Sequence, residues 1–159
     1  MTVTEKDTYF FHRAIALALE AERLGNLPIG VVICLNDEIV SEGKNAIWVP
    51  RYDPVRHAEI EALKSVPGEL WNSSRQMILY TTLEPCLMCA GAILLHQIGK
   101  VVYGASDDYG GSSSIFASMP KYFAEQYAGA EWVGPALSQE CDPLFARVLE
   151  LEKERGDRK

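Results

Sequence analysis

The feature that most constrains the fold is the alternation, along the whole chain, of short β-branched apolar runs with longer segments of helical periodicity. Strands are expected at residues 29–35, 38–44, 77–82, 101–104 and 131–133. Helices are expected at residues 6–24, 57–67, 85–99, 115–127 and 143–155. This alternation favours an α/β fold with a mostly parallel sheet covered on both faces, and one antiparallel pair at the hairpin formed by the first two strands.

Length and composition are typical of one globular domain, which we expect to occupy residues 1–159. Hydrophobic residues make up 48% of the chain and charged residues 23%, so disordered and fibrous classes are excluded. No apolar run reaches the roughly 18–20 residues of a membrane span, and the first ten residues lack the pattern of a secretory signal. We therefore expect a cytoplasmic protein that does not contact a membrane.

The net charge of the chain indicates whether a nucleic acid is an expected partner. Fifteen Lys and Arg against 22 Asp and Glu give a formal charge of −7. Nucleic-acid backbones are bound by clustered Lys and Arg, so this balance argues against a broad nucleic-acid-binding face.

Three residues combine metal-ligand chemistry with suggestive spacing: His57, Cys86 and Cys89. Two thiolates and one imidazole suit Zn²⁺, and the Cys-x-x-Cys spacing brings both sulfurs to the first turn of the helix expected after Pro85. Three protein ligands leave a fourth tetrahedral position for water, whose pKa falls toward about 7 on zinc. Glu59 lies two residues after His57 and could move a proton at such a site without ligating the metal.

Two other interpretations of these cysteines stay open at this stage. A lone Cys-x-x-Cys can be a redox pair, although a redox motif has no use for a His-x-Glu pattern. A structural zinc would close with a fourth protein ligand, for which the remaining candidates are His12, His96 and Cys141. Cys34 lies in an apolar run and is expected to be a small buried residue.

The combination of His57-Ala58-Glu59 with Pro85-Cys86-Leu87-Met88-Cys89 resembles the zinc-dependent cytidine and nucleobase deaminase superfamily. The resemblance covers most of the chain and is closest to the branch that holds bacterial tRNA adenosine deaminases, guanine deaminases and fungal cytosine deaminase. It implies a three-layer cytidine-deaminase-like fold, with a five-stranded mixed sheet and helices on both faces.

The resemblance also implies the roles of individual residues. Zn²⁺ would be held by His57, Cys86 and Cys89, and Glu59 would be the catalytic proton shuttle. A zinc-activated water would attack the carbon that bears an exocyclic amine and release ammonia. The family pattern also implies a homodimer formed through helices that flank the site.

Substrate contacts are expected from a further set of residues. The resemblance implies a side-chain contact from Asn45, backbone contacts from the segments around Ala58, Glu84 and Pro85, and a place at the pocket rim for Asp107. Trp48, in the loop after the second strand, could stack on a base or could instead cap the core or a dimer seam.

Three functions compete at this stage. Residues 106–111 are acidic and glycine-rich where the tRNA-acting branch is basic, so a deaminase of a small nucleobase, nucleoside or related heterocycle is favoured. The alternative is a tRNA-specific adenosine deaminase that converts the wobble adenosine to inosine. A zinc-stabilised, inactive binding module is the third, and Glu59 argues against it because such a module needs no proton shuttle.

Overall fold

The structure, a computed structural model, describes residues 4–156; the first three and last three residues of the expected domain lie outside the described part. Its strands are β1 Gly30–Leu35, β2 Glu38–Lys44, β3 Ile78–Leu83, β4 Lys100–Ala105 and β5 Glu131–Val133. Its α-helices are α1 Glu5–Arg23, α2 Ala58–Ser65, α3 Leu87–Leu95, α4 Lys121–Ala128 and α5 Ser138–Arg155. Two 3-10 helices, η1 Gly68–Gln76 and η2 Ser113–Ser118, complete the element order.

The five strands form one mixed sheet in the order β2-β1-β3-β4-β5. The expected five-stranded mixed sheet with an antiparallel hairpin is confirmed, but β1 also pairs antiparallel with β3, a second antiparallel pairing that the sequence did not predict. The reason is topological. The connection through α2 and η1 places β3 on the side of β1 that is away from β2. Because β3 runs in the same direction as β2, it is antiparallel to β1, which lies between them. Only β3, β4 and β5 pair in parallel.

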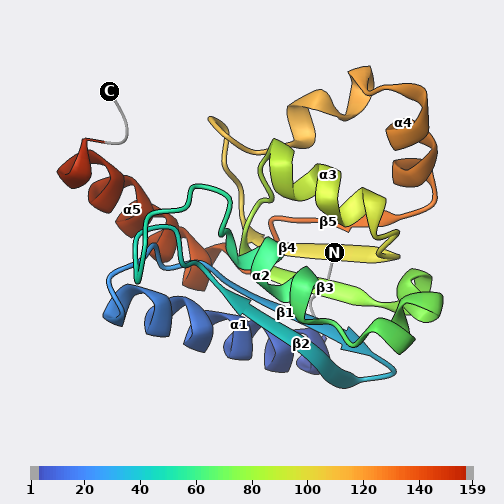
Figure 1. The fold of residues 1–159 in the computed structure, drawn as a ribbon, viewed down its shortest axis with the longest axis horizontal. Coiled ribbons are helices and arrows are strands. Elements are labelled where there is room, and N and C mark those ends of the chain that lie inside the picture. Colours follow the sequence, from blue (N-terminus) through green and yellow to red (C-terminus); the bar gives the residue numbers. More distant parts are fainter. Residues whose placement is uncertain (1–3, 157–159) are drawn as a thin grey trace.

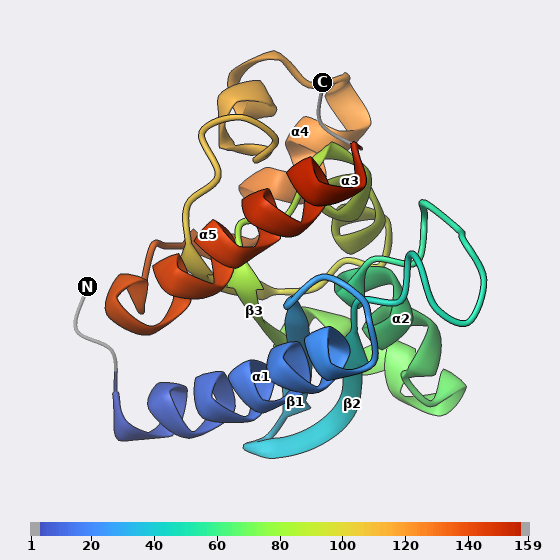
Figure 2. The same cartoon turned by 90° about the vertical axis from the view of Figure 1, so that its left-hand side faces the viewer.

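Helices cover both faces of the sheet, as expected (Figure 1). Alternate residues of β1 enter two separate apolar clusters: Val32 and Cys34 pack with α1, whereas Val31 and Ile33 pack with the cluster that includes α2 and α3. Helices α1 and α5 lie side by side, and the ion pair between Glu22 of α1 and Arg147 of α5, at 2.7 Å, links them (Figure 2). The result is a three-layer fold.

Pro120 and the packing of Cys141 account for two differences between the expected and the observed helices. The helix expected at residues 115–127 is divided by Pro120, which caps α4 and keeps Met119 in an extended conformation. The closing helix begins at Ser138 and contains Pro143, because the buried Cys141 packs this segment against the sheet at Gly104.

Strand direction also decides where the site lies. Strands β2, β3 and β4 run the same way, so their carboxyl ends meet at one edge of the sheet. Asn45 follows β2, Glu84 follows β3, and the loop of residues 106–112 follows β4. Ligand sites of open α/β sheets lie at such an edge.

Within the described residues, no helix is both long and apolar enough to cross a bilayer.

The close contact of α2 with β2 gives a stability prediction. A Cβ on Gly43 would lie 2.1 Å from the carbonyl oxygen of Ala58 and 2.5 Å from the amide nitrogen of Ala62, so Gly43→Ala must push the helix off the strand. Overpacking of this kind lowers the free energy of unfolding by about 1–3 kcal/mol. Urea unfolding of Gly43→Ala beside Gly68→Ala, whose Cβ would meet no atom within 4 Å, measures the difference; equal midpoints would contradict this packing.

Candidate active site

Two helix N-termini converge on the candidate metal ligands. His57 is the N-cap of α2 and Cys86 is the N-cap of α3, both with extended backbones (ψ 155° and 173°). N-cap side chains normally accept a hydrogen bond from their own helix, but neither of these does. Cys89 lies in the first turn of α3. Each helix therefore presents its ligand outward, with its positive dipole end near the two sulfurs.

The spacing of the ligand atoms fits zinc. His57 Nδ1 lies 3.6 Å from the Sγ of Cys86 and 3.6 Å from the Sγ of Cys89, and the three ligand atoms lie within 4.8 Å of one another. A tetrahedral ion with Zn–N and Zn–S bonds of ordinary length would separate nitrogen from sulfur by about 3.6 Å. The nitrogen of His57 that faces both sulfurs is Nδ1; the sequence alone does not indicate which of the two ring nitrogens would bind the metal.

The cluster contains three protein ligands within residues 4–156. The other candidates lie elsewhere: His12 pairs with Glu140 at 3.1 Å, and Nδ1 of His96 is 2.8 Å from the carbonyl oxygen of Ala92. Cys141 is buried against Gly104. Three ligands with one open position are the pattern of a catalytic zinc site, whereas a structural zinc has four protein ligands.

The two cysteine thiols differ in their tendency to ionise. Hydrogen bonds with Cys89 and His57 lower the pKa of Cys86 to about 4 despite its burial, so this thiol is ionised at neutral pH. The hydrogen bond to Cys86 raises the pKa of His57, and the same thiolate raises the pKa of Cys89. The Cys86 thiolate is thus ready to bind a soft divalent cation, whereas the Cys89 thiol must lose its proton when the metal binds.

Glu59 is buried beside these ligands, with 4% of its surface exposed. Burial, and after it the charge of Cys86, raises the pKa of Glu59 to about 7, and the Cys89 thiol is a hydrogen-bond partner. A carboxyl group with a pKa near neutrality can both accept and return a proton. Glu61, two residues further along α2, differs: it pairs with Arg56 at 2.9 Å and with Lys64 at 3.3 Å.

His57, Cys86 and Glu59 line a cavity of about 160 Å³, which is smaller than most drug-sized sites and suited to one ring system. Apolar walls come from Leu27, Ile29, Ile47, Leu83 and Val148. The polar lining consists of Asn45, His57, Glu59, Glu84, Cys86, Asp107, Gly110 and Glu152. Val148 and Glu152 are one helical turn apart on α5, and the sequence gives no local signal that this distant helix forms part of the wall.

Asn45 has the features of a ligand contact. Its side chain is 1% exposed, and Oδ1 accepts from the amides of Leu27 at 3.4 Å and Ile47 at 3.3 Å. Its Nδ2 has no hydrogen-bond partner within the described structure, although a buried donor is costly to leave unpaired. A ligand acceptor in the cavity would satisfy it.

The other expected contact residues are distributed differently. Glu84 and Asp107 line the cavity, whereas the lining does not include Ala58, Pro85 or Trp48. The Trp48 ring packs under the guanidinium of Arg155, whose Cζ is 3.9 Å from the ring centroid. That contact fixes the loop after β2 to α5 and supports the core-capping interpretation of Trp48 over base stacking.

Comparison with known proteins agrees with this geometry. Residues 4–105 match the family model of the cytidine and deoxycytidylate deaminase zinc-binding region. A tRNA-specific adenosine deaminase of Bacillus subtilis is 35% identical over 94% of this chain and 93% of that protein. One from Buchnera aphidicola is 41% identical, over 64% of this chain and 62% of that protein, so this match spans less than two thirds of the relative.

Solved structures give the same assignment. A structure from a study of A-to-I editing by tRNA:A34 deaminases is 32% identical, with a TM-score of 0.67, covering 80% of this chain and 98% of the other. Guanine deaminase from Bacillus subtilis is 28% identical, with a TM-score of 0.57, covering 87% of this chain and 91% of the other. With the family model, the fold and the ligand cluster in agreement, the chain belongs to the zinc-binding cytidine and deoxycytidylate deaminase family and is a hydrolytic deaminase.

Proposed function

We propose that this deaminase acts on adenosine at the wobble position of tRNA, converting it to inosine. The observation that carries the proposal is the similarity, at 35% and 41% identity, to proteins named tRNA-specific adenosine deaminases. The small enclosed cavity is compatible with it, because enzymes that modify a base take that base out of the stack into a pocket. A tRNA substrate would place the protein in the cytoplasm.

The residues divide the chemistry between them. Zinc, when held by His57, Cys86 and Cys89, supplies a nucleophilic water at neutral pH. The Glu59 carboxylate would hold a proton within the site and pass it to the exocyclic nitrogen, which leaves as ammonia. Asn45 donates from Nδ2 to an acceptor atom of the base and so orients the amine-bearing carbon toward Glu59.

Glu59→Gln tests the shuttle. The amide keeps the shape of the side chain but cannot accept a proton, so the rate of deamination should fall by about 10²–10⁴. Zinc should stay bound, since the three ligands are untouched. Steady-state ammonia release with metal analysis measures both, and Glu61→Gln on the same helix is the matched control. Near-normal turnover by Glu59→Gln would mean that another group transfers the proton.

A second candidate is the deamination of a free base or nucleoside, which the charge of the site favours. The loop of residues 106–114 holds Asp107 and Asp108 and no Lys or Arg. Within residues 4–156, four carboxyl groups line the cavity, those of Glu59, Glu84, Asp107 and Glu152. The chain as a whole carries −7. Such a surface offers few contacts to phosphates, and the similarity to guanine deaminase is consistent with a free heterocycle.

One experiment separates the two candidates. An anticodon stem-loop with adenosine at the wobble position is assayed for inosine beside free bases and nucleosides, with a guanosine-substituted stem-loop as the control. Our proposal predicts inosine at the wobble position and little turnover of free bases. No Lys or Arg among the described residues lines the cavity, so the rate should depend only weakly on salt. Turnover of a free base with an untouched stem-loop would contradict the proposal and support the second candidate.

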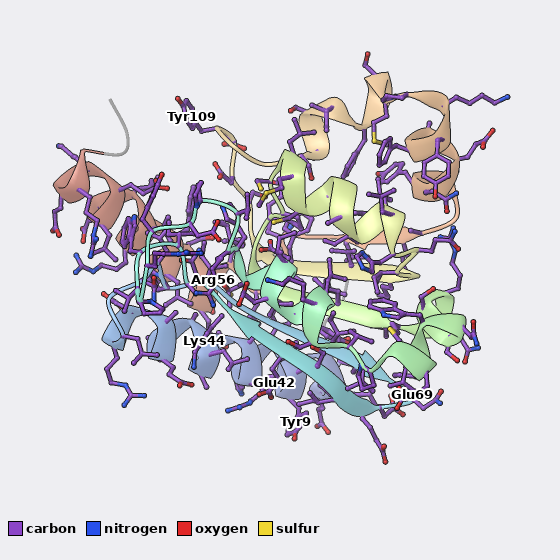
Figure 3. The ribbon with its side chains drawn as sticks, in the orientation of Figure 1. Tyr9, Glu42, Lys44, Arg56, Glu69 and Tyr109 are labelled. Atoms are coloured by element: carbon purple, nitrogen blue, oxygen red, sulfur yellow. The ribbon has the colours of Figure 1, made fainter. Side chains whose placement is uncertain are left out.

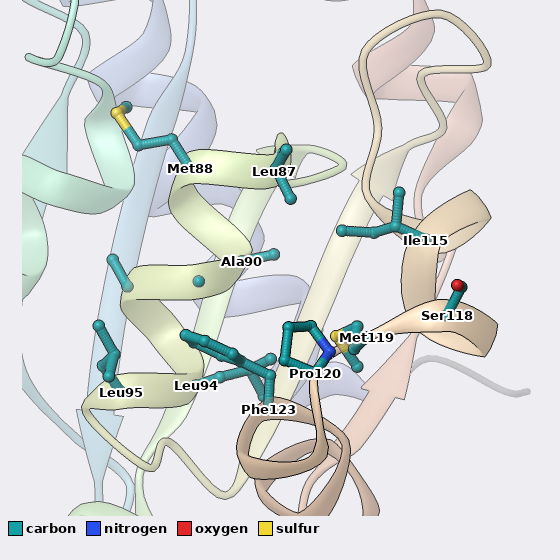
Figure 4. Close-up of a pocket in the computed structure, with 12 residues that line it drawn as sticks. Leu87, Met88, Ala90, Leu94, Leu95, Ile115, Ser118, Met119, Pro120 and Phe123 are labelled. Atoms are coloured by element: carbon teal, nitrogen blue, oxygen red, sulfur yellow. The ribbon is translucent and has the colours of Figure 1, made fainter.

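We also propose a homodimer, formed through the outer face of α3. The inner face of this helix is buried, yet Leu87 is 64% exposed and Leu95 56% exposed on the outer face. Between α3 and the segment from Ile115 to Phe123 lies an apolar groove of about 590 Å³ (Figure 4). A helix that is apolar on both faces is normally buried on both, and a second copy supplies the missing cover.

Light scattering at micromolar concentration should give about twice the chain mass of 17.7 kDa. Leu95→Glu places a charge in the proposed interface and should shift the protein to monomer. Leu19→Glu, at a comparably exposed leucine on α1 (52%), should leave the dimer intact. A monomeric wild-type protein, or equal behaviour of the two variants, would contradict this interface.

A further inference from the structure

The carboxylate of Glu84 lies at the centre of the loop that closes the cavity. Its Oε2 accepts from the amide of Asp107 at 3.1 Å. Its Oε1 accepts from the amide of Ser113 at 2.9 Å and from the hydroxyl of the same residue at 2.6 Å. Glu84 is 5% exposed, so these hydrogen bonds are made by a buried charged group. One side chain therefore holds both ends of the segment 107–113.

The backbone of this segment packs directly on the carboxylate. A Cβ on Gly111 would lie 2.5 Å from Cδ of Glu84 and 2.5 Å from the carbonyl oxygen of Asp107. No side chain larger than hydrogen fits there without displacing one of them. The backbone of the loop thus packs closely against the Glu84 carboxylate, and this contact adds to the hydrogen bonds in fixing the loop conformation.

The same loop is joined to the metal-ligand segment by backbone contacts. Cys86 forms an isolated antiparallel bridge with Gly111, and the amide of Ser112 donates to the carbonyl of Pro85 at 3.0 Å. Asp107 in turn accepts from the amides of Tyr109 and Gly110 at 3.0 and 2.9 Å. The middle of the loop is therefore tied to the ligand Cys86, while its two ends depend on Glu84.

We propose that Glu84 is a positioning residue. Its hydrogen bonds to the loop hold Asp107 and Gly110, at the rim of the cavity, in a fixed position relative to the ligand Cys86. Both of its oxygens are occupied by the loop, so it acts on the substrate through the rim and does not contact the substrate itself. Asp107 and Gly110 line the cavity in which a bound heterocycle must be held. The inference rests on the deaminase activity and applies to either substrate candidate.

Glu84→Gln tests this role, because its amide turns an N–H group toward one of the N–H donors of the loop. Hydrogen exchange, which needs no substrate, should show faster exchange at the amides of Asp107 and Ser113 and unchanged exchange within β3. Zinc content should stay at one per chain. KM should rise about tenfold or more, as expected for loss of a charge-assisted hydrogen bond, with a much smaller change in kcat.

Two further variants and a control make the result specific. Ser113→Ala removes the hydroxyl donor to Glu84 and should raise KM, by less than Glu84→Gln does. If Glu84→Gln does not fold, Ser113→Ala provides the test. Gly111→Ala should displace the carboxylate and reproduce the exchange pattern. Glu69→Gln, at an exposed glutamate on η1 far from the loop tip at Tyr109 (Figure 3), should change nothing.

Three results would overturn the proposal: unchanged exchange and KM in Glu84→Gln, loss of zinc in that variant, or a fall in kcat at constant KM. KM is measured on whichever substrate the ammonia assay identifies, and exchange is measured without substrate. Failure of the tRNA assignment would therefore leave this test intact.

Discussion

The site depends on the convergence of two helix N-termini, those of α2 and α3, at the edge where parallel-running strands end. Each helix gives its N-cap side chain to the cluster instead of using it to cap itself, so His57 Nδ1 stands 3.6 Å from both sulfurs. The dipoles of both helices favour the thiolate of Cys86. The close packing of α2 on Gly43 and the hydrogen bond from Ser41 Oγ to the carbonyl oxygen of Ala62, at 2.6 Å, fix one of the two helices on the sheet.

Much of this could be predicted from the sequence, because the signals are local. The five strands and the ligand motif follow from apolar spacing and from the residue types at 57, 59, 86 and 89. The antiparallel pairing of β1 with β3 could not be predicted, since it depends on which side of the hairpin the α2 crossover places β3. The contribution of Glu152 also depends on tertiary packing, because α5 reaches the cavity from the far end of the chain.

Residue roles were harder to predict than residue positions. Trp48 has the chemistry of a stacking residue, but its ring is covered by Arg155. Glu84 lines the cavity, yet its carboxylate is engaged by the rim loop. Charge and similarity also point in different directions on the substrate: a formal charge of −7 favours a small heterocycle, whereas the relatives are tRNA deaminases. A positioned pocket that accepts one flipped base would reconcile the two, because it needs few phosphate contacts.

The central claim is that His57, Cys86 and Cys89 form a three-ligand zinc site with one position open for chemistry. X-ray absorption at the zinc edge, on protein as purified, tests this most directly. We expect two sulfur ligands at about 2.3 Å and two nitrogen or oxygen ligands at about 2.0 Å, one of them exchangeable with solvent. A third sulfur, a second histidine that completes a closed shell, or a shell without sulfur would contradict it.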